Sequence, residues 1–259
     1  FDDQWHYYEQ AGGLNLPTAW DTATGSGVVV AVLDTGYRPH ADLNANILPG
    51  YDMISNLSVA NDGGGRDSDA RDPGDAVAAN ECGTNGAQNS SWHGTHVAGT
   101  VAAVTNNGEG VAGVAYNAKV VPVRVLGKCG GLTSDIADGI IWASGGSVSG
   151  IPANSNPADV INMSLGGSGS CSSTTQNAIN TARSNGTVVV IAAGNDNDNS
   201  ANYNPGNCNG VVNVASVGRN GGRAYYSNYG SNIDVAAPGG AQSFANDSEG
   251  VLSTYNSGS

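Results

Sequence analysis

The chain has 259 residues, a formal net charge of −13 and a sequence pI near 4.3. This acidity excludes a nucleic-acid-binding protein, which needs a basic surface against the phosphates, and no apolar run approaches the roughly 20 residues that span a bilayer, so no membrane association is expected. The length suits one α/β domain with a sizeable core.

The first part of the chain is predicted to hold one buried strand. Residues 1–13 form an irregular aromatic arm in this prediction, and a short helix follows, capped by Asn15 with Pro17 in its first turn. Residues 28–33 are a continuous β-branched run, typical of a parallel strand buried on both faces. Ligands in open α/β sheets bind beyond the carboxyl ends of strands. Asp34, which follows this run, is therefore better placed for chemistry than for packing.

Residues 52–75 form a long acidic loop without apolar periodicity. Ca²⁺ takes oxygen ligands from carboxylates on flexible loops that contain glycine, and the glycines here permit sharp turns around an ion. We predict a structural calcium ion at this loop; a solvated acidic surface is the alternative. The candidate ligands are Asp52, Asp62, Asp67, Asp69 and Asp72.

Residues 91–100 contain two histidines in a turn that leads into an apolar helical segment reaching about residue 104. An imidazole exchanges a proton near neutral pH, so His93 at the start of the helix is a candidate general base. Two histidines three residues apart can also bind a metal. Because neither an HExxH motif nor a third ligand accompanies them, we interpret His96 as structural.

The four cysteines favour a secreted protein with two disulfides, as do the scarcity of lysine and the abundance of small polar residues. Of three possible pairings we favour the sequential one, Cys82 with Cys129 and Cys171 with Cys208, because each bond closes a short loop. Free or metal-binding thiols are the alternative, which no CxxC spacing supports. No basic and apolar leader precedes Phe1, as expected of a processed, mature protein.

The second half of the chain alternates strands with helices. This order predicts an α/β fold with a doubly wound, mostly parallel sheet flanked by helices, and residues 144–157 are predicted to be an inserted loop. The expected strands are residues 120–125, 160–163, 188–192, 211–214 and 233–236, and the expected helices are about 134–142 and 174–184.

Asp34, His93 and Asn195 together are most of an acyl-transfer site. A carboxylate orients an imidazole, the imidazole deprotonates a serine, and an amide donates a hydrogen bond to the oxyanion. Asn195 comes soon after the strand at 188–192, as Asp34 follows its own strand. Each residue by itself would also suit a structural role.

Four motifs follow one another along nearly the whole chain: Val32-Leu-Asp34-Thr-Gly36, His93-Gly-Thr-His96-Val-Ala-Gly99, Ser164-Leu-Gly-Gly167 and Ala192-Ala-Gly-Asn195. They resemble the motifs of the subtilisin-like serine proteases (subtilases), in the order of that family. The resemblance implies a secreted endopeptidase that cleaves polypeptides through a Ser-His-Asp acyl-enzyme mechanism. In it Asp34 orients His93, His93 is the general base, and Asn195 donates to the oxyanion.

The resemblance also implies substrate-binding segments. Gly130 and Gly131 resemble the edge strand along which an extended substrate pairs. Ser164, Leu165, Gly166 and Gly167 resemble the opposite strand and, with Ala192, Ala193 and Gly194, line a roomy pocket. Because no acid or base stands in these segments, we expect a preference for bulky apolar side chains before the scissile bond.

The nucleophile block of the family, Gly-Thr-Ser, is absent, and Ser253, Ser257 and Ser259 lack that context. We therefore expect residues 1–259 to be an incomplete subtilisin-like peptidase domain, truncated or nicked, whose serine lies on a C-terminal fragment of the same protease; the complete domain is expected to be monomeric. A catalytically inactive binding module is the alternative. An NAD-binding domain fails, because Gly25 and Gly27 precede their strand instead of following it.

Overall fold

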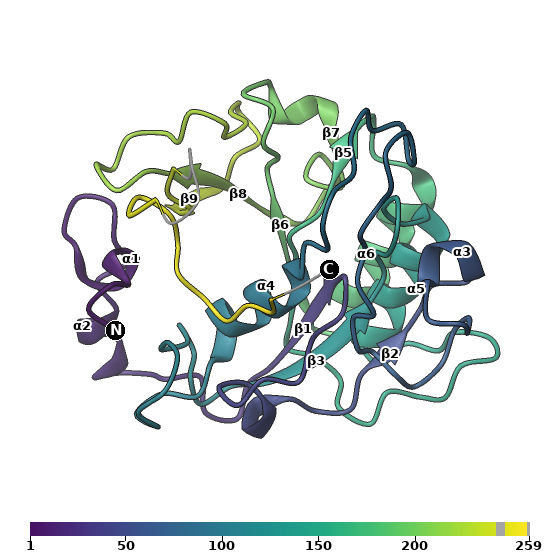
Figure 1. The fold of residues 1–259 in the computed structure, drawn as a ribbon, viewed down its shortest axis with the longest axis horizontal. Helices are drawn as coiled ribbons and strands as arrows, with labels where there is room; N and C mark the ends of the chain where they lie inside the picture. Colours follow the sequence, from purple (N-terminus) through teal and green to yellow (C-terminus); the bar gives the residue numbers. More distant parts are fainter. Residues whose placement is uncertain (242–246, 258–259) are drawn as a thin grey trace.

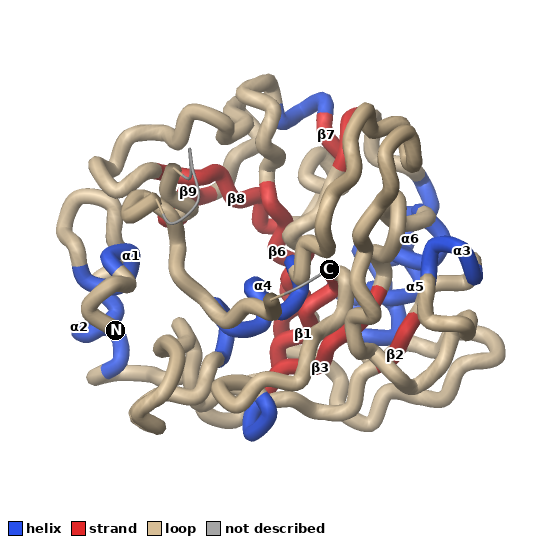
Figure 2. Tube along the Cα trace, in the orientation of Figure 1, coloured by secondary structure: helices blue, strands red, loops and turns tan. Residues whose placement is uncertain are grey.

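A seven-stranded sheet forms the centre of the computed structural model, which describes residues 1–241 and 247–257 (Figures 1 and 2). Every neighbouring pair in its order, β2-β3-β1-β4-β6-β8-β9, is parallel, and β5 and β7 form a separate antiparallel pair. The strands are β1 (Val29–Asp34), β2 (Tyr51–Asp52), β3 (Lys119–Arg124), β4 (Val160–Met163), β5 (Gly167–Ser168), β6 (Val188–Ala192), β7 (Tyr203–Asn204), β8 (Val212–Val217) and β9 (Val235–Pro238). The predicted α/β fold with a mostly parallel sheet is confirmed.

Helices cover both faces of the sheet, because parallel strands that are apolar on both sides must be buried on both. One core cluster joins α4 to β1 and β3 on one face, and a larger cluster joins α5 and α6 to the other. The helices are α1 (Trp5–Tyr8), α2 (Leu16–Trp20), α3 (Leu57–Ala60), α4 (His93–Ala102), α5 (Thr133–Ala143) and α6 (Ser173–Ser184), with 3₁₀ turns η1 (Asn44–Asn46) and η2 (Ser200–Asn202). No helix in the described ranges combines the length and apolar character that crossing a bilayer requires.

The strand order changes direction beside β1, which pairs with β3 on one side and with β4 on the other. In open α/β sheets this is the switch point where ligands bind, beyond the carboxyl ends of the strands. Asp34 is the last residue of β1 and is fully buried. The topology therefore places Asp34 at the position where this fold builds its sites.

Three local expectations are wrong. The aromatic arm contains a helical turn, α1, because Trp5 and Tyr7 are buried against the domain. Asn15 adopts a left-handed conformation (φ 53°) and makes no side-chain capping bond to α2. The acidic loop contains α3, whose first turn is capped by the side chain of Asn56.

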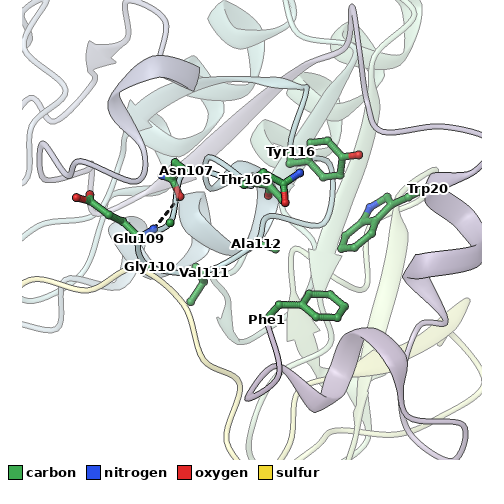
Figure 3. A pocket seen from close by; sticks show the side chains of 11 residues that line it. Phe1, Trp20, Thr105, Asn107, Glu109, Gly110, Val111, Ala112 and Tyr116 are labelled. Carbon is green, nitrogen blue, oxygen red and sulfur yellow. Dashed lines mark hydrogen bonds between the residues drawn. The ribbon is translucent and has the colours of Figure 1, made fainter.

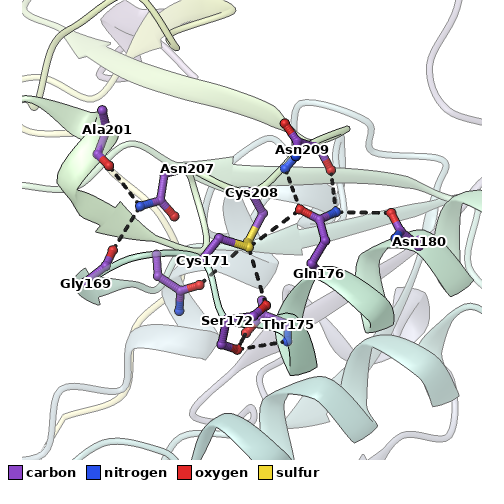
Figure 4. The surroundings of a disulfide bond; sticks show 11 residues. Gly169, Cys171, Ser172, Thr175, Gln176, Asn180, Ala201, Asn207, Cys208 and Asn209 are labelled. Atoms are coloured by element: carbon purple, nitrogen blue, oxygen red, sulfur yellow. Dashed lines mark hydrogen bonds between the residues drawn. A yellow bond between two sulfur atoms is a disulfide. The ribbon is translucent and has the colours of Figure 1, made fainter.

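Both predicted disulfides are confirmed: Cys82 bonds to Cys129 and Cys171 bonds to Cys208. Figure 4 shows the second bond beside the start of α6, where Gln176 accepts a hydrogen bond from the backbone N–H of Asn209 at 2.8 Å. This hydrogen bond links α6 to the segment before β8. The other disulfide, Cys82–Cys129, joins the segment before α4 to the turn after β3 and lines the same cavity as His93.

Candidate active site

Asp34 and His93 form a hydrogen-bonded pair. The Nδ1 atom of His93 lies 2.8 Å from Oδ1 and 2.9 Å from Oδ2 of Asp34. Asp34 is fully buried, whereas 46% of the His93 side chain is exposed. A buried carboxylate on Nδ1 leaves Nε2 as the ring nitrogen available to a substrate-side group, which is the arrangement of a general base with its orienting acid.

The charge of Asp34 changes the proton affinity of His93. The hydrogen bond to the carboxylate raises the pKa of His93 above its ordinary value of 6.5, and partial burial of the ring acts in the opposite direction. Asp75 adds a smaller raising effect through its negative charge. Because an opposite charge favours the protonated ring, His93 holds a proton more tightly than a free histidine does.

Two glycines allow α4 to approach the end of β1. Gly94 lies so close to Gly36 that a Cβ atom on it would overlap the Gly36 carbonyl oxygen. Gly36 has a φ of +99°, a conformation that glycine adopts without a steric penalty. This close approach brings the first residue of α4, His93, within hydrogen-bonding distance of the last residue of β1.

The segment before His93 is held by residues that the sequence did not single out. Asp75 accepts hydrogen bonds from the backbone N–H of Ser91 at 2.6 Å and from its hydroxyl at 2.7 Å. Trp92 is buried in a left-handed conformation (φ 48°), with the Arg38 guanidinium 5.6 Å from its ring. For Ser91 and Trp92 the only sequence signal was their position directly before His93, and Asp75 had none, since its partner Ser91 lies 16 residues further along the chain.

A cavity of about 330 Å³ opens beside His93. Its wall includes two of the predicted substrate-binding residues, Gly130 and Ser164, and the Cys82–Cys129 disulfide. Gly130 lies in a turn closed by two backbone hydrogen bonds with Gly127, and its pairing with an extended substrate stays a prediction. Gly131 adjoins the same turn.

The other predicted substrate-binding residues follow two neighbouring strands. Met163 of β4 pairs in register with Ile191 of β6, so Ser164 and Ala192 continue side by side from the same edge of the sheet. Gly167 begins β5, and Ala192 is exposed whereas Ala193 is buried. Leu165 and Gly166 lie between β4 and β5, and Gly194 (φ 108°) and the exposed Asn195 follow β6.

Residues 25–259 match the family model described as the subtilase family. The chain belongs to the subtilase family. It is 64% identical over 257 residues to the extracellular protease of Xanthomonas campestris pv. campestris, covering 99% of this chain and 43% of that protein. It is 51% identical over 245 residues to the extracellular basic protease of Dichelobacter nodosus, covering 92% and 40%. This subtilase chain therefore spans less than half the length of either relative.

The fold of this subtilase also matches solved structures. One is a cold adapted subtilisin-like serine proteinase, with a TM-score of 0.65 and 29% sequence identity over 92% of this chain and 72% of that one. The comparison supports the subtilisin-like architecture of the sheet and its flanking helices.

The acidic loop of this subtilase does not gather its carboxylates around one point. Arg124, fully buried at the end of β3, pairs with Asp52 and, at 3.0 Å, with Asp62. Asp69 accepts a 2.7 Å hydrogen bond from Arg71 Nε, and Asp67 accepts one of 2.7 Å from the Asp69 backbone.

Asp72 turns away from the loop surface, because its oxygens accept from Thr35 and Gly74. Across residues 1–241 and 247–257 no group of three or more His, Cys, Asp or Glu residues is placed to hold a metal. As they lie here the five predicted ligands do not fit one ion, and calcium stays a prediction of the sequence.

His96 contacts the chain's last described segment. Its Nε2 lies 3.1 Å from the carbonyl oxygen of Val251, and its own carbonyl accepts from the Ser253 hydroxyl at 2.7 Å. These contacts support a structural role for His96. Of the late serines, Ser253 is used in this contact, and Ser259 lies outside the described residues.

A second cavity, of about 490 Å³, lies apart from His93 at the N-terminal arm (Figure 3). Phe1, Trp20 and Tyr116 form its aromatic side, and the loop of residues 105–112 forms the other. The indole N–H of Trp20 already donates to the carbonyl of Val114 at 2.8 Å. None of the predicted site residues lines this cavity.

Proposed function

We propose that this chain is the acid- and base-bearing part of an extracellular serine endopeptidase that cleaves polypeptides through an acyl-enzyme. The Asp34–His93 pair carries the proposal, because a buried carboxylate on Nδ1 is what a catalytic imidazole needs to accept a proton from a serine. The names of the two relatives, both extracellular proteases, support the compartment and the activity. The two disulfides agree with an oxidising compartment.

The nucleophile in this proposal is a serine outside the 259 residues, on a C-terminal segment of the same protease. Ser O–H gives its proton to Nε2 of His93 as the oxygen attacks the peptide carbonyl, and Asn195 donates to the oxyanion. His93 then returns the proton to the leaving amine, and water hydrolyses the acyl-enzyme. The complete domain is proposed to act as a monomer.

Substrate binding in this proposal uses the cavity beside His93 and the ends of β4 and β6. Small side chains there leave room for a bulky apolar residue before the scissile bond. The test is cleavage of a peptide series that varies this residue. Apolar substrates should have the highest kcat/KM, and a preference for acidic or basic residues would contradict the proposed pocket.

A fluorophosphonate probe tests the activity directly. We expect it to label the complete protease on a serine that intact-mass analysis and denaturing electrophoresis assign to a segment after residue 259. If only the 259-residue species is present and the probe labels nothing, the enzyme proposal is wrong for this material. The inactive binding module would then account for the chain.

Activity should rise with pH, and its midpoint should lie above 6.5. His93 accepts a proton only when neutral, and Asp34 raises its pKa, so the ring loses its proton at a higher pH than a free histidine. The same pairing stabilises the folded state fully below pH 6.5 and stops doing so as pH rises through the raised pKa. A kcat/KM profile with a midpoint below 6.5 would contradict the pairing.

Structural calcium is tested by thermal unfolding. In the proposed calcium-bound form, carboxylates of the loop of residues 52–75 contact the ion instead of an arginine. Removing the ion with excess EGTA should then lower the melting temperature by about 5 °C. Asp67→Asn combined with Asp69→Asn should remove that sensitivity, because both carboxylates belong to the predicted ligand set. An unchanged melting curve in EGTA would remove calcium from the proposal.

A further inference from the structure

A chain of hydrogen bonds leads from the acidic loop to the start of α4. Thr35 follows Asp34, and its backbone N–H donates to Asp34 Oδ1 at 2.8 Å. The Thr35 hydroxyl donates to Oδ2 of Asp72 at 2.7 Å and accepts from the backbone N–H of Gly94 at 3.0 Å. One residue thus contacts the orienting acid, the loop and the helix that carries the base.

The hydroxyl of Thr35 caps one of the first N–H groups of α4. These groups have no partner inside a helix, and the first of them, the His93 N–H, donates to the Ser91 hydroxyl at 3.3 Å. The Gly94 N–H instead finds its acceptor on the neighbouring segment after β1. The cap therefore comes from the same stretch of chain as Asp34, which ties the position of His93 to that of its acid.

Asp72 determines which way the Thr35 hydroxyl points. Thr35 has one hydroxyl proton, and donating it to Asp72 leaves an oxygen lone pair free for Gly94. Asp72 is only 1% exposed, and its other oxygen accepts from the Gly74 N–H at 2.8 Å. Its own N–H donates to the carbonyl of Tyr37 at 2.9 Å. Because both the carboxylate and the backbone N–H of Asp72 are hydrogen-bonded, the buried carboxylate stays in place and keeps the Thr35 hydroxyl in one orientation.

A second contact ties the same part of the loop to α4. Nη1 of Arg38 donates to the carbonyl of Asp72 at 3.1 Å, and the Arg38 guanidinium lies over the ring of Trp92. The Arg38 backbone N–H donates to the Thr95 hydroxyl at 2.9 Å. The position of Asp72 relative to the first turn of α4 is thus set independently of Thr35.

We propose that Asp72 and Thr35 are a positioning pair for the catalytic dyad: Asp72 orients the Thr35 hydroxyl, which caps α4 and holds His93 in line with Asp34. The inference rests on the proposed protease function. It gives Asp72, predicted from the sequence as a calcium ligand, a role in the geometry of the site. Neither residue touches the reacting atoms, so their effect reaches the reaction through His93.

Four variants of the complete protease test the pair. Thr35→Val removes the hydroxyl at nearly the same volume, and Thr35→Ser keeps it. In Asp72→Asn the amide has one acceptor oxygen where the carboxylate used two, so either Thr35 or Gly74 loses its partner. The fourth variant combines Thr35→Val with Asp72→Asn.

We expect T35V and D72N each to lower kcat about 10- to 100-fold with little change in KM, since a small misplacement of a catalytic group has effects of this size. T35S should stay within about twofold of the wild type. The double variant should be no slower than the slower single variant, because both changes break one path. The Nδ1 proton resonance of His93 should shift in T35V and D72N and not in T35S.

A wild-type kcat in folded T35V, or a double variant whose loss is the product of the two single losses, would overturn the pair. If T35V does not fold, the comparison of D72N with T35S tests the pair instead, because D72N alters the acceptor of the Thr35 hydroxyl while T35S keeps that hydroxyl. A wild-type protease that neither cleaves peptides nor reacts with a fluorophosphonate would instead contradict the proposed function. The two failures are therefore distinguishable.

Discussion

Asp34→Asn should lower kcat of the complete protease by about 10⁴-fold. The backbone N–H of Thr35 donates to Asp34 Oδ1, so an asparagine would keep its oxygen there and turn its NH₂ toward His93. That NH₂ requires Nδ1 to be the unprotonated nitrogen, which puts the ring proton on Nε2, where the serine proton must be received. Steady-state kinetics at saturating substrate measure the loss.

The matched control is Asp21→Asn, which removes one carboxylate at an exposed position at the end of α2. This variant should keep the wild-type kcat, since Asp21 belongs to none of the contacts around His93. Circular dichroism should show both variants folded. A D34N enzyme that retains more than about a tenth of the wild-type kcat would show that Asp34 is not the orienting acid.

Gly94→Ala should destabilise the fold by about 3 kcal/mol, a cost typical of overpacking at a tight contact. The added Cβ would overlap the carbonyl oxygen of Gly36, and both partners are backbone, so neither can move without shifting β1 or α4. Because His93 precedes Gly94, the same shift should separate it from Asp34 and lower kcat. Denaturant unfolding measures the first effect, and kinetics below the unfolding transition measure the second.

Gly86→Ala is the control for this substitution. A Cβ on Gly86 meets no atom within 4 Å, so the free energy of unfolding should change by less than about 0.5 kcal/mol. Equal stability of the two alanine variants would mean that α4 and β1 are not in the close contact described. Loss of stability in G94A without loss of kcat would separate helix packing from the alignment of His93.

The strands and the Asp34–His93 pair are predicted from local sequence patterns. The apolar runs at residues 28–33, 160–163 and 188–192 predict β1, β4 and β6, because a parallel strand buried on both faces needs such a run. Asp34 and His93 are predicted because each stands where such an element begins or ends, and because their motifs occur in the order of the subtilases. The structure confirms that the two side chains meet.

The acidic loop shows where local patterns stop being sufficient. Its aspartates are alike in sequence, yet Asp52 pairs with Arg124, 72 residues away, and Asp72 binds Thr35, 37 residues away. Composition predicts that carboxylates at this density need cations or donors, but not which ones the fold supplies. The turn at Gly130 likewise depends on a backbone contact, with Gly127, that composition does not predict.

The sequence by itself predicted the α/β class, the disulfide pairing and the pairing of Asp34 with His93, because these predictions use periodicity, spacing and motif order, which can be read along the chain. The tertiary structure alone decided how that pair is held. Thr35, Asp72, Gly36 and Gly94 act through contacts between segments distant in sequence. Such contacts depend on how β1, α4 and the acidic loop pack together, which no single stretch of sequence records.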